Sequence, residues 1–306
     1  MITLPLEPVR RNVHDTVVKT LAGAEQMPDR YTRHPGDPGL FGPDSATWVV
    51  HADLPSMLLG GISALFLQTL HPLAMAGVAD HSDFRRDPLG RLQRTGAFVA
   101  TTTFAATPVA ERSIRTVRKV HERVVGTAPD GRPYSANDPD LLRWVHCAEI
   151  GSFLRSYQRY SGHPLEAPDA DRYVSEVAVL AEHLGATDVP RSQGELRSYF
   201  RSIRPELEVG DQARSTVDFL MRGTSAEPAD RVAYTVLVQA AVGLLPAWGR
   251  EMLGLRQVPL IEWAAVRPAA RSIGGVLRWA MGPSEVATQA RDRCAALPEP
   301  AEVHPA

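Results

Sequence analysis

The 306-residue chain is poor in cysteine and in lysine. Its only thiols, Cys147 and Cys294, are far apart in the sequence, so neither a disulfide framework nor a thiolate metal site is predicted. Lysine occurs only at Lys19 and Lys119, and the formal net charge is -2, with no stripe of basic residues. A nucleic acid is therefore not an expected partner.

The N-terminus lacks the basic and then apolar segments of a secretory signal, so a cytoplasmic protein is expected. Residues 57–79 are apolar and numerous enough to span a bilayer. They include Gln68, His71 and Pro72 and have no aromatic belt, which favours a buried core helix. Peripheral membrane contact and assembly into a homo-oligomer are left open.

The composition and the apolar spacing indicate a globular helical protein. With 44% hydrophobic and 22% charged residues, the chain can bury a sizeable core. Because no strand-turn-strand series, repeat or Pro/Gly-rich linker occurs, the predicted fold class is all-α, a single domain of many helices. We expect this domain over residues 46–290, an extended arm packed on it at 1–45, and a disordered tail at 291–306.

Capping residues mark the expected helix boundaries. Asp87, followed by proline, predicts a helix over residues 88–104, and Asp138, also followed by proline, predicts one over 139–160. Between them, a helix opening at 107–108 is expected to end at Gly126. Later helices are predicted at 229–255, with a kink near Pro246, and at about 260–280, with a break at Pro268.

Three of the ten histidines, His71, His121 and His146, fall within strongly apolar helical stretches. Each could simply hydrogen-bond a carbonyl or a carboxylate in the core. Alternatively, a neutral imidazole on an apolar helix face is the ligand that a haem iron requires. Arg118, one turn before His121, would then be placed to meet a haem propionate.

A second group of polar side chains opens the helix at 88–104. Arg91, Arg94 and Thr95 lie at positions i, i+3 and i+4, so they can converge on one small site. Above an open haem face, such donors would stabilise negative charge on bound dioxygen. The alternative is a solvated helix edge that carries two arginines, and spacing alone favours neither interpretation.

Three ordered blocks carry these features: LQTLHPLAMAGVADHSDFRRDPLGRLQRT, RKVHERVVG and GRPYSANDPDLLRWVH. Together they resemble the family of the oxygenase MpaB and the latex-clearing proteins, or rubber oxygenases, over roughly residues 40–255. The resemblance implies haem b in an all-α, globin-related core and oxidative cleavage of an isoprenoid carbon–carbon double bond by dioxygen. By motif, it makes His121 behind Arg118 the iron ligand, and it makes Arg91, Arg94 and Thr95 the distal residues.

Position 94 departs from the rubber-oxygenase pattern, in which a lysine can lose its proton and reach the iron. An arginine cannot be deprotonated, so Arg94 is expected to donate hydrogen bonds and to leave the sixth iron position to water or empty. His71 and His146 could contact a propionate, orient His121 or ligate iron themselves. No catalytic acid or base is assigned. A small isoprenoid, lipid or aromatic substrate is expected in place of an extracellular polymer.

Three other classes of function compete with a haem oxygenase. A non-haem di-iron bundle would need two Glu-x-x-His units, whereas the chain has one unit of reversed order, His146-x-x-Glu149. A serine hydrolase would need a G-x-S-x-G elbow, which does not occur in the sequence. A helical carrier or regulatory protein, with or without haem, is compatible with the same fold.

Overall fold

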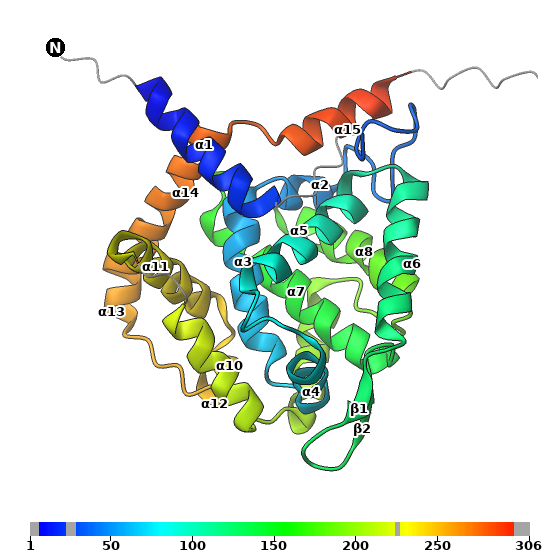
Figure 1. Cartoon of the computed structure of the whole chain (residues 1–306), viewed down its shortest axis with the longest axis vertical. Helices are drawn as coiled ribbons and strands as arrows, with labels where there is room; N and C mark the ends of the chain where they lie inside the picture. The colour runs from blue at the N-terminus through cyan, green and yellow to red at the C-terminus, as the bar shows by residue number, and fades with distance from the viewer. Residues whose placement is uncertain (1–5, 23–28, 224–226, 297–306) are drawn as a thin grey trace, which may run out of the picture.

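The computed structural model describes residues 6–22, 29–223 and 227–296 as one body of helices with a small hairpin (Figure 1). The prediction of an all-α fold in a single helical domain is confirmed. The first part of the body consists of α1 (Leu6–Ala22), α2 (Ala46–His51), α3 (Leu54–Gln68), α4 (Pro72–His81), α5 (Pro88–Phe104), α6 (Thr107–His121), β1 (Val125–Thr127), β2 (Pro133–Ser135) and α7 (Pro139–Tyr160).

In the described residues after α7, all the regular elements are helices, and loops connect them. It consists of α8 (Ala167–Leu184), α9 (Gln193–Ser202), η1 (Arg204–Glu206), α10 (Asp211–Arg222), α11 (Pro228–Leu244), α12 (Ala247–Met252), α13 (Pro259–Ile261), η2 (Glu262–Val266), α14 (Arg267–Met281) and α15 (Glu285–Ala295).

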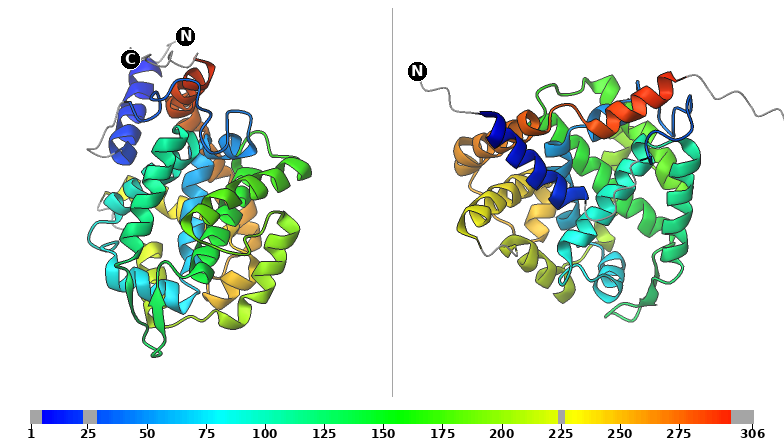
Figure 2. Two further views of the ribbon diagram at one scale, coloured as in Figure 1. Left: turned by 90° about the vertical axis from the view of Figure 1, so that its right-hand side faces the viewer. Right: turned by 45° about the horizontal axis from the view of Figure 1, so that its top comes forward.

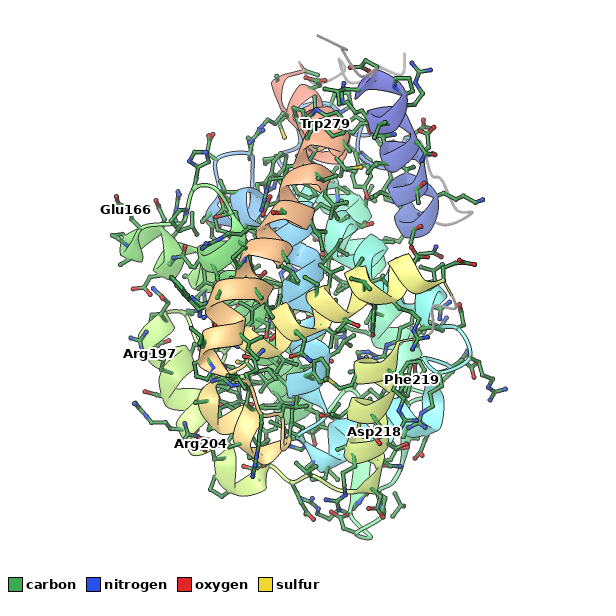
Figure 3. The ribbon with its side chains drawn as sticks, turned by 90° about the vertical axis from the view of Figure 1, so that its left-hand side faces the viewer. Glu166, Arg197, Arg204, Asp218, Phe219 and Trp279 are labelled. Atoms are coloured by element: carbon green, nitrogen blue, oxygen red, sulfur yellow. The ribbon has the colours of Figure 1, made fainter. Side chains whose placement is uncertain are left out.

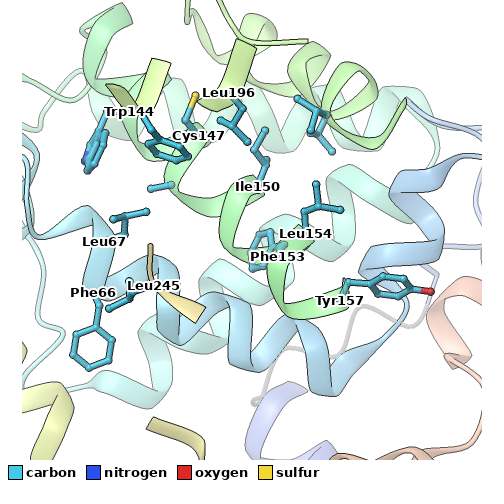
Figure 4. Close-up of a cluster of buried hydrophobic side chains, with 14 of the residues drawn as sticks. Phe66, Leu67, Trp144, Cys147, Ile150, Phe153, Leu154, Tyr157, Leu196 and Leu245 are labelled. Carbon is cyan, nitrogen blue, oxygen red and sulfur yellow. The ribbon is translucent and has the colours of Figure 1, made fainter. Parts of the chain in front are cut away.

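The core lies between α3 and α7, whose backbones approach closely. A Cβ on Gly60 would lie 2.9 Å from the Cα of Phe153, so only glycine fits at this crossing. Figure 4 shows part of the apolar cluster around it, and these labelled side chains include Phe66, Leu67, Trp144, Cys147, Ile150, Leu154, Tyr157, Leu196 and Leu245. This tight crossing fixes the middle of α7, which contributes two polar side chains to the site described below.

The apolar stretch at 57–79 forms most of α3 and α4. Among the described residues, no single helix has the length and hydropathy of a membrane span. α3 and α4 reach that length and composition only as a pair, and they are bent by 108° at their junction. Much of α3 is buried against α7, which confirms that this stretch is core helix.

Two predicted helix starts are confirmed by their caps. The Asp87 carboxylate accepts a hydrogen bond from the Gly90 N–H, and Asp138 caps α7 by accepting from the N–H groups of Asp140 and Leu141. α6, however, ends at His121 instead of at Gly126, because the chain turns there into β1. The hairpin strands were not predicted, since three residues are too few to show an alternating pattern.

The two prolines of the C-terminal half act differently from the prediction. At Pro246 the helix stops instead of kinking: α11 ends at Leu244, and α12 begins at Ala247. Pro268 does not break its helix, because it lies in the first turn of α14, where its missing N–H is tolerated. The irregularity falls just before it, in the π turn η2.

The segments at the two chain ends also differ from the expectation. The arm expected at residues 1–45 contains the helix α1, which packs on α5 and α14. Helix α15 continues to Ala295, so the first part of the tail expected at 291–306 is helical, and residues 297–306 lie outside the described residues. Figure 2 shows α1 and α15 on the same side of the body.

Candidate active site

α5 and α6 are joined by residues 105–106 and diverge from this connection (Figure 1). On α5, Thr102 is fully buried, whereas Thr95, about two turns earlier on the same face, is exposed. On α6, Ile114 is buried, and His121, about two turns later on its face, is only half-buried. On each helix, the face that is buried near the connection is therefore uncovered farther from it. We call these two faces, around Thr95 and His121, the open end.

The α5 side of the open end is partly apolar and lacks a partner in the described chain. Leu92 is 42% exposed, and a Cβ placed on Gly96 would meet no atom within 4 Å. Thr95 is exposed and forms no hydrogen bond with any described residue. A partly apolar surface that no described residue covers is typical of a place where a group binds.

His121 is the last residue of α6, and its ring is neutral at ordinary pH. Burial lowers the pKa of His121, and the neighbouring Asn137 side chain opposes that shift. The His121 Nδ1 and the Asn137 Oδ1 are nevertheless both buried without a hydrogen bond of regular geometry. The Asn137 amide donates instead to the Arg118 carbonyl, at 3.2 Å. Asn137 is thus placed to orient the ring through Nδ1 and leave Nε2 for a ligand.

Arg118 lies one turn before His121 on α6, and its side chain already has a partner outside the open end. Its Nη1 donates to the main-chain carbonyl of His183, at the end of α8, over 3.3 Å. The side chain is exposed, so it could turn toward an anionic group without leaving a buried charge unpaired.

The other two predicted histidines are buried and each has one unpartnered ring nitrogen. His71 is 3% exposed, precedes α4 and lies beside the Trp144 ring, and burial lowers its pKa to about 4. His146, inside α7, is 8% exposed with a pKa of about 4 for the same reason. The His71 Nδ1 and the His146 Nε2 form no hydrogen bond with described residues. All three histidines therefore remain neutral. His146 belongs to the N-terminal half of α7, His71 lies beside Trp144 of that helix, and His121 lies beside Asn137, which precedes it.

Of the two predicted distal arginines, one faces inward and the other faces outward. Arg91 is half-buried: its Nη1 donates to the Ser82 hydroxyl at 2.7 Å, and its guanidinium lies 5.8 Å from the Phe84 ring centroid. Arg94 is exposed and forms an ion pair of 3.2 Å with Asp87, the residue that caps the same helix. Arg91 is therefore better placed than Arg94 to act on a group inside the protein.

Glu149 is the ionisable residue that the sequence analysis left without a role. It lies on α7, and its carboxylate accepts a hydrogen bond of 3.3 Å from Gln68 Nε2 on α3. Burial raises the pKa of Glu149 to about 7, although the hydrogen bond from Gln68 and the charge of Arg91 both oppose the rise. A carboxyl group that titrates near neutral pH can hold or release a proton under ordinary conditions.

A buried polar chain continues from Glu149 into the core. Burial raises the pKa of Tyr173 well above its ordinary value, and the nearby charge of Glu149 adds to the rise. The Tyr173 hydroxyl lies 3.1 Å from Nε2 of His51, whose Nδ1 lies 2.7 Å from the Thr103 hydroxyl on α5. Burial lowers the pKa of His51 to about 3, so its ring is neutral. These groups satisfy one another within the fold.

Sequence reasoning missed Glu149, Asn137 and His51 as members of this region. A charged residue inside the apolar stretch CAEIGSF was a usable signal for Glu149. Nothing in the local sequence distinguishes Asn137 or His51, because their partners, His121 and Tyr173, come from other helices.

No three His, Cys, Asp or Glu side chains come together as a metal site in the described part of the chain. The ligand set of a di-iron bundle is therefore missing from these residues. Comparison with protein families gives a match of residues 48–280 to the model described as the catalytic domain of ER-bound oxygenase mpaB/B'/rubber oxygenase. The chain belongs to this family.

The matched range of the MpaB/rubber oxygenase family contains every residue of the open end and all of α7. Membership places the protein in a family of oxygenases, and hence of oxidoreductases. No curated protein and no solved structure matches the chain. The globin relationship implied by the resemblance therefore stays a prediction.

Proposed function

We propose that this protein is a haem b-dependent oxygenase that uses dioxygen on a small apolar substrate of the isoprenoid, lipid or aromatic class. The observation that carries the proposal is the open end itself, where the neutral His121 and the uncovered α5 face around Thr95 both lie away from the connection at residues 105–106. Family membership supports oxygenase chemistry at this place.

The residues at the open end fit a haem group. His121 offers a neutral ring with an amide at its Nδ1 side, the arrangement in which Nε2 can bind iron. Leu92 and the bare Gly96 offer an apolar surface to a flat ring, and Arg118 is a mobile cation for a propionate. A haem bound on this surface would shield Leu92 and Thr95 from solvent.

When bound, the haem would supply an iron that binds dioxygen and makes it reactive. The protein residues do the rest. Arg91, fixed by Ser82 and Phe84, would donate to negative charge that develops on the oxygen atoms. Thr95, one turn from Arg91, has a free hydroxyl that can donate to the same group.

For a carbon–carbon double bond the proposed reaction needs no further reductant. The double bond breaks, each of its carbons takes one atom of the dioxygen molecule, and two carbonyl groups result. Glu149 would hold a proton on its carboxyl oxygen or take one from the substrate, as its pKa of about 7 permits both states. Gln68 keeps this carboxyl group oriented during the transfer.

The test is an absorption spectrum of protein produced with ample haem precursor, recorded oxidised, then dithionite-reduced, then with carbon monoxide. We expect a Soret band that shifts on carbon monoxide, which requires an iron with an accessible sixth position. Screening of isoprenoid, lipid and aromatic compounds for dioxygen consumption then identifies the substrate.

A haem-free or non-catalytic carrier is the competing function of the same fold. Colourless protein that takes up no added haem would refute the haem oxygenase and leave the carrier. Coloured protein that consumes no dioxygen with any of the three substrate classes would leave a haem-binding protein without the proposed reaction.

A further inference from the structure

The outer face of the helical run α13–η2–α14 is almost devoid of charge. Its exposed side chains, between residues 259 and 281, are Pro259, Leu260, Ile261, Trp263, Ala264, Ala265, Pro268, Arg271, Ser272, Gly275, Val276 and Trp279. Arg271 is the one charged residue among them, and Ser272 is the one hydroxyl. We call this set of residues the outer face. Water-facing helices normally carry many charges, so the outer face is not built to stay in water alone.

The large side chains of the outer face are strongly exposed. Leu260 is 69% exposed, Trp263 is 66% exposed and Trp279 is 42% exposed. Trp48 and Trp144, by comparison, are among the largest fully buried side chains of the protein. Tryptophan, which joins a large apolar ring to a polar N–H, is enriched at membrane–water interfaces.

The π turn η2 lies between the two ends of the outer face. It takes in one more residue than an α turn would, which rotates α14 relative to α13. The buried Glu262 holds this turn against the core. Its Oε1 accepts a hydrogen bond of 2.6 Å from Arg267 Nε and lies 3.6 Å from Arg159 Nη1. Leu260, Ala264, Pro268, Ser272 and Trp279 are exposed along the resulting run. The exposed stripe is therefore held by the fold.

Helix α1 extends the same surface at the Trp279 end. α1 packs against α14, with Arg10 Nε donating to the Trp279 carbonyl over 3.3 Å, and Leu6 and Val9 are 60% and 55% exposed. Figure 1 places α1, α14 and α13 along one edge of the molecule, and Figure 3 faces that edge, with Trp279 at the upper end of α14.

From residue 256 to residue 282, the exposed charged side chains are all basic. Glu262 is the only acidic residue from 256 to 282; it is buried and already paired with arginines. Arg256 and Arg271 are exposed, and neither forms an ion pair with a described residue. A two-fold contact between two copies would bring these arginines together with no carboxylate in the outer face to meet them. Anionic lipid headgroups would supply the missing negative charge.

We propose that the outer face binds the surface of an anionic lipid bilayer, with α13–η2–α14 lying in the plane of the interface. Leu260, Trp263 and Trp279 enter the acyl boundary, and Arg256 and Arg271 meet the lipid phosphates. This surface is distinct from the buried stretch 57–79 and independent of the haem proposal.

The experiment is flotation of the full-length protein with phosphatidylcholine vesicles that contain or lack phosphatidylglycerol. We expect binding to the anionic vesicles that weakens with added salt, and fluorescence quenching of the exposed tryptophans by lipids brominated in their acyl chains. Leu260→Asp and Trp263→Asp should each weaken binding about tenfold or more, since each removes a large apolar contact. Val125→Asp, at a valine of β1 that is 52% exposed and lies outside the outer face, is the control and should bind as the wild type does.

Three results would overturn the proposal. The wild type could stay unbound with anionic vesicles, or Trp263→Asp could bind as well as the control. Sedimentation could also show a wild-type dimer that Trp263→Asp dissociates, which would make the outer face a subunit interface. Circular dichroism of each variant checks that the exposed substitution has left the fold intact.

Discussion

Glu149 of α7 faces Arg91 of α5 without forming an ion pair with it. Each charge shifts the pKa of the other group, yet no nitrogen–oxygen contact within 4.0 Å joins them. Ser82 and Phe84 hold the guanidinium on one side, and Gln68 holds the carboxyl group on the other. In a poorly hydrated region opposite charges influence one another over longer distances than they do in water, so the two groups are electrostatically coupled without direct contact.

Changing Glu149 to glutamine should make the free energy of unfolding depend less on pH. The folded protein raises the pKa of Glu149 from 4.5 to about 7, so the fold binds this proton more tightly than the unfolded chain does. The stability from this group is complete below pH 4.5 and is lost as the pH rises through 7. Glu149→Gln should therefore recover up to about 3 kcal/mol at pH 8 relative to pH 5.

Thermal unfolding of the haem-free protein at the two pH values measures this difference. Glu111→Gln, at a half-buried residue of α6 that pairs with Arg115, is the control and should follow the wild type. An identical loss of stability between pH 5 and pH 8 in Glu149→Gln and the wild type would mean that another group is responsible.

Replacing His121 by alanine should abolish haem incorporation or change the Soret spectrum, because the proposed iron ligand is lost. His183→Ala, on the exposed end of α8, serves as the control and should keep the wild-type spectrum. An unchanged spectrum in His121→Ala, together with a lost one in His146→Ala, would transfer the ligand assignment to α7.

Asn137 should affect haem binding by orienting the His121 ring. Asn137→Leu removes the amide beside Nδ1 and should weaken haem binding about 10- to 100-fold, as loss of a partner to a metal-ligating histidine commonly does. Titration of the haem-free protein with haem gives the affinity. A shift in the reduction potential of the bound haem separates this orienting role from simple destabilisation, and no change in either quantity would contradict it.

Arg91 and Arg94 should differ in their effects on turnover. Arg91→Ala should retain haem and lower kcat by about a hundredfold, since an inward donor to developing charge is removed. Arg94→Ala should have a much smaller effect, because this side chain is exposed and paired with Asp87. Dioxygen consumption at saturating substrate compares the two, and equal losses would show that both guanidiniums act at the same group.

The α3–α7 crossing gives a prediction that does not depend on function. Gly60→Ala should destabilise the protein by about 1–3 kcal/mol, because its Cβ would collide with the Phe153 backbone. Gly61→Ala is the matched control: its nearest neighbour would be 3.9 Å away, so alanine should be neutral or stabilising. Denaturant unfolding of both variants tests this, and equal stability of the two would place the tight contact elsewhere.

The sequence by itself determined the helical fold class, the start of α5 at Asp87 and the start of α7 at Asp138, since capping and apolar period are local properties. It also determined the family, because the three motif blocks are written in order along the chain. The end of α6 at His121 was missed, since the turn into the hairpin depends on the pairing of β1 with β2.

Only the tertiary structure decided which side chains share a site. The spacing of Arg91 and Arg94 is compatible with convergence, but burial turns one inward while Asp87 holds the other at the surface. Glu149 acquires its raised pKa among helices that are distant in the sequence, and Asn137 is brought beside His121 by the β1–β2 hairpin between them. Desolvation and opposing charge are properties of three-dimensional neighbours, and no local pattern in the chain encodes them.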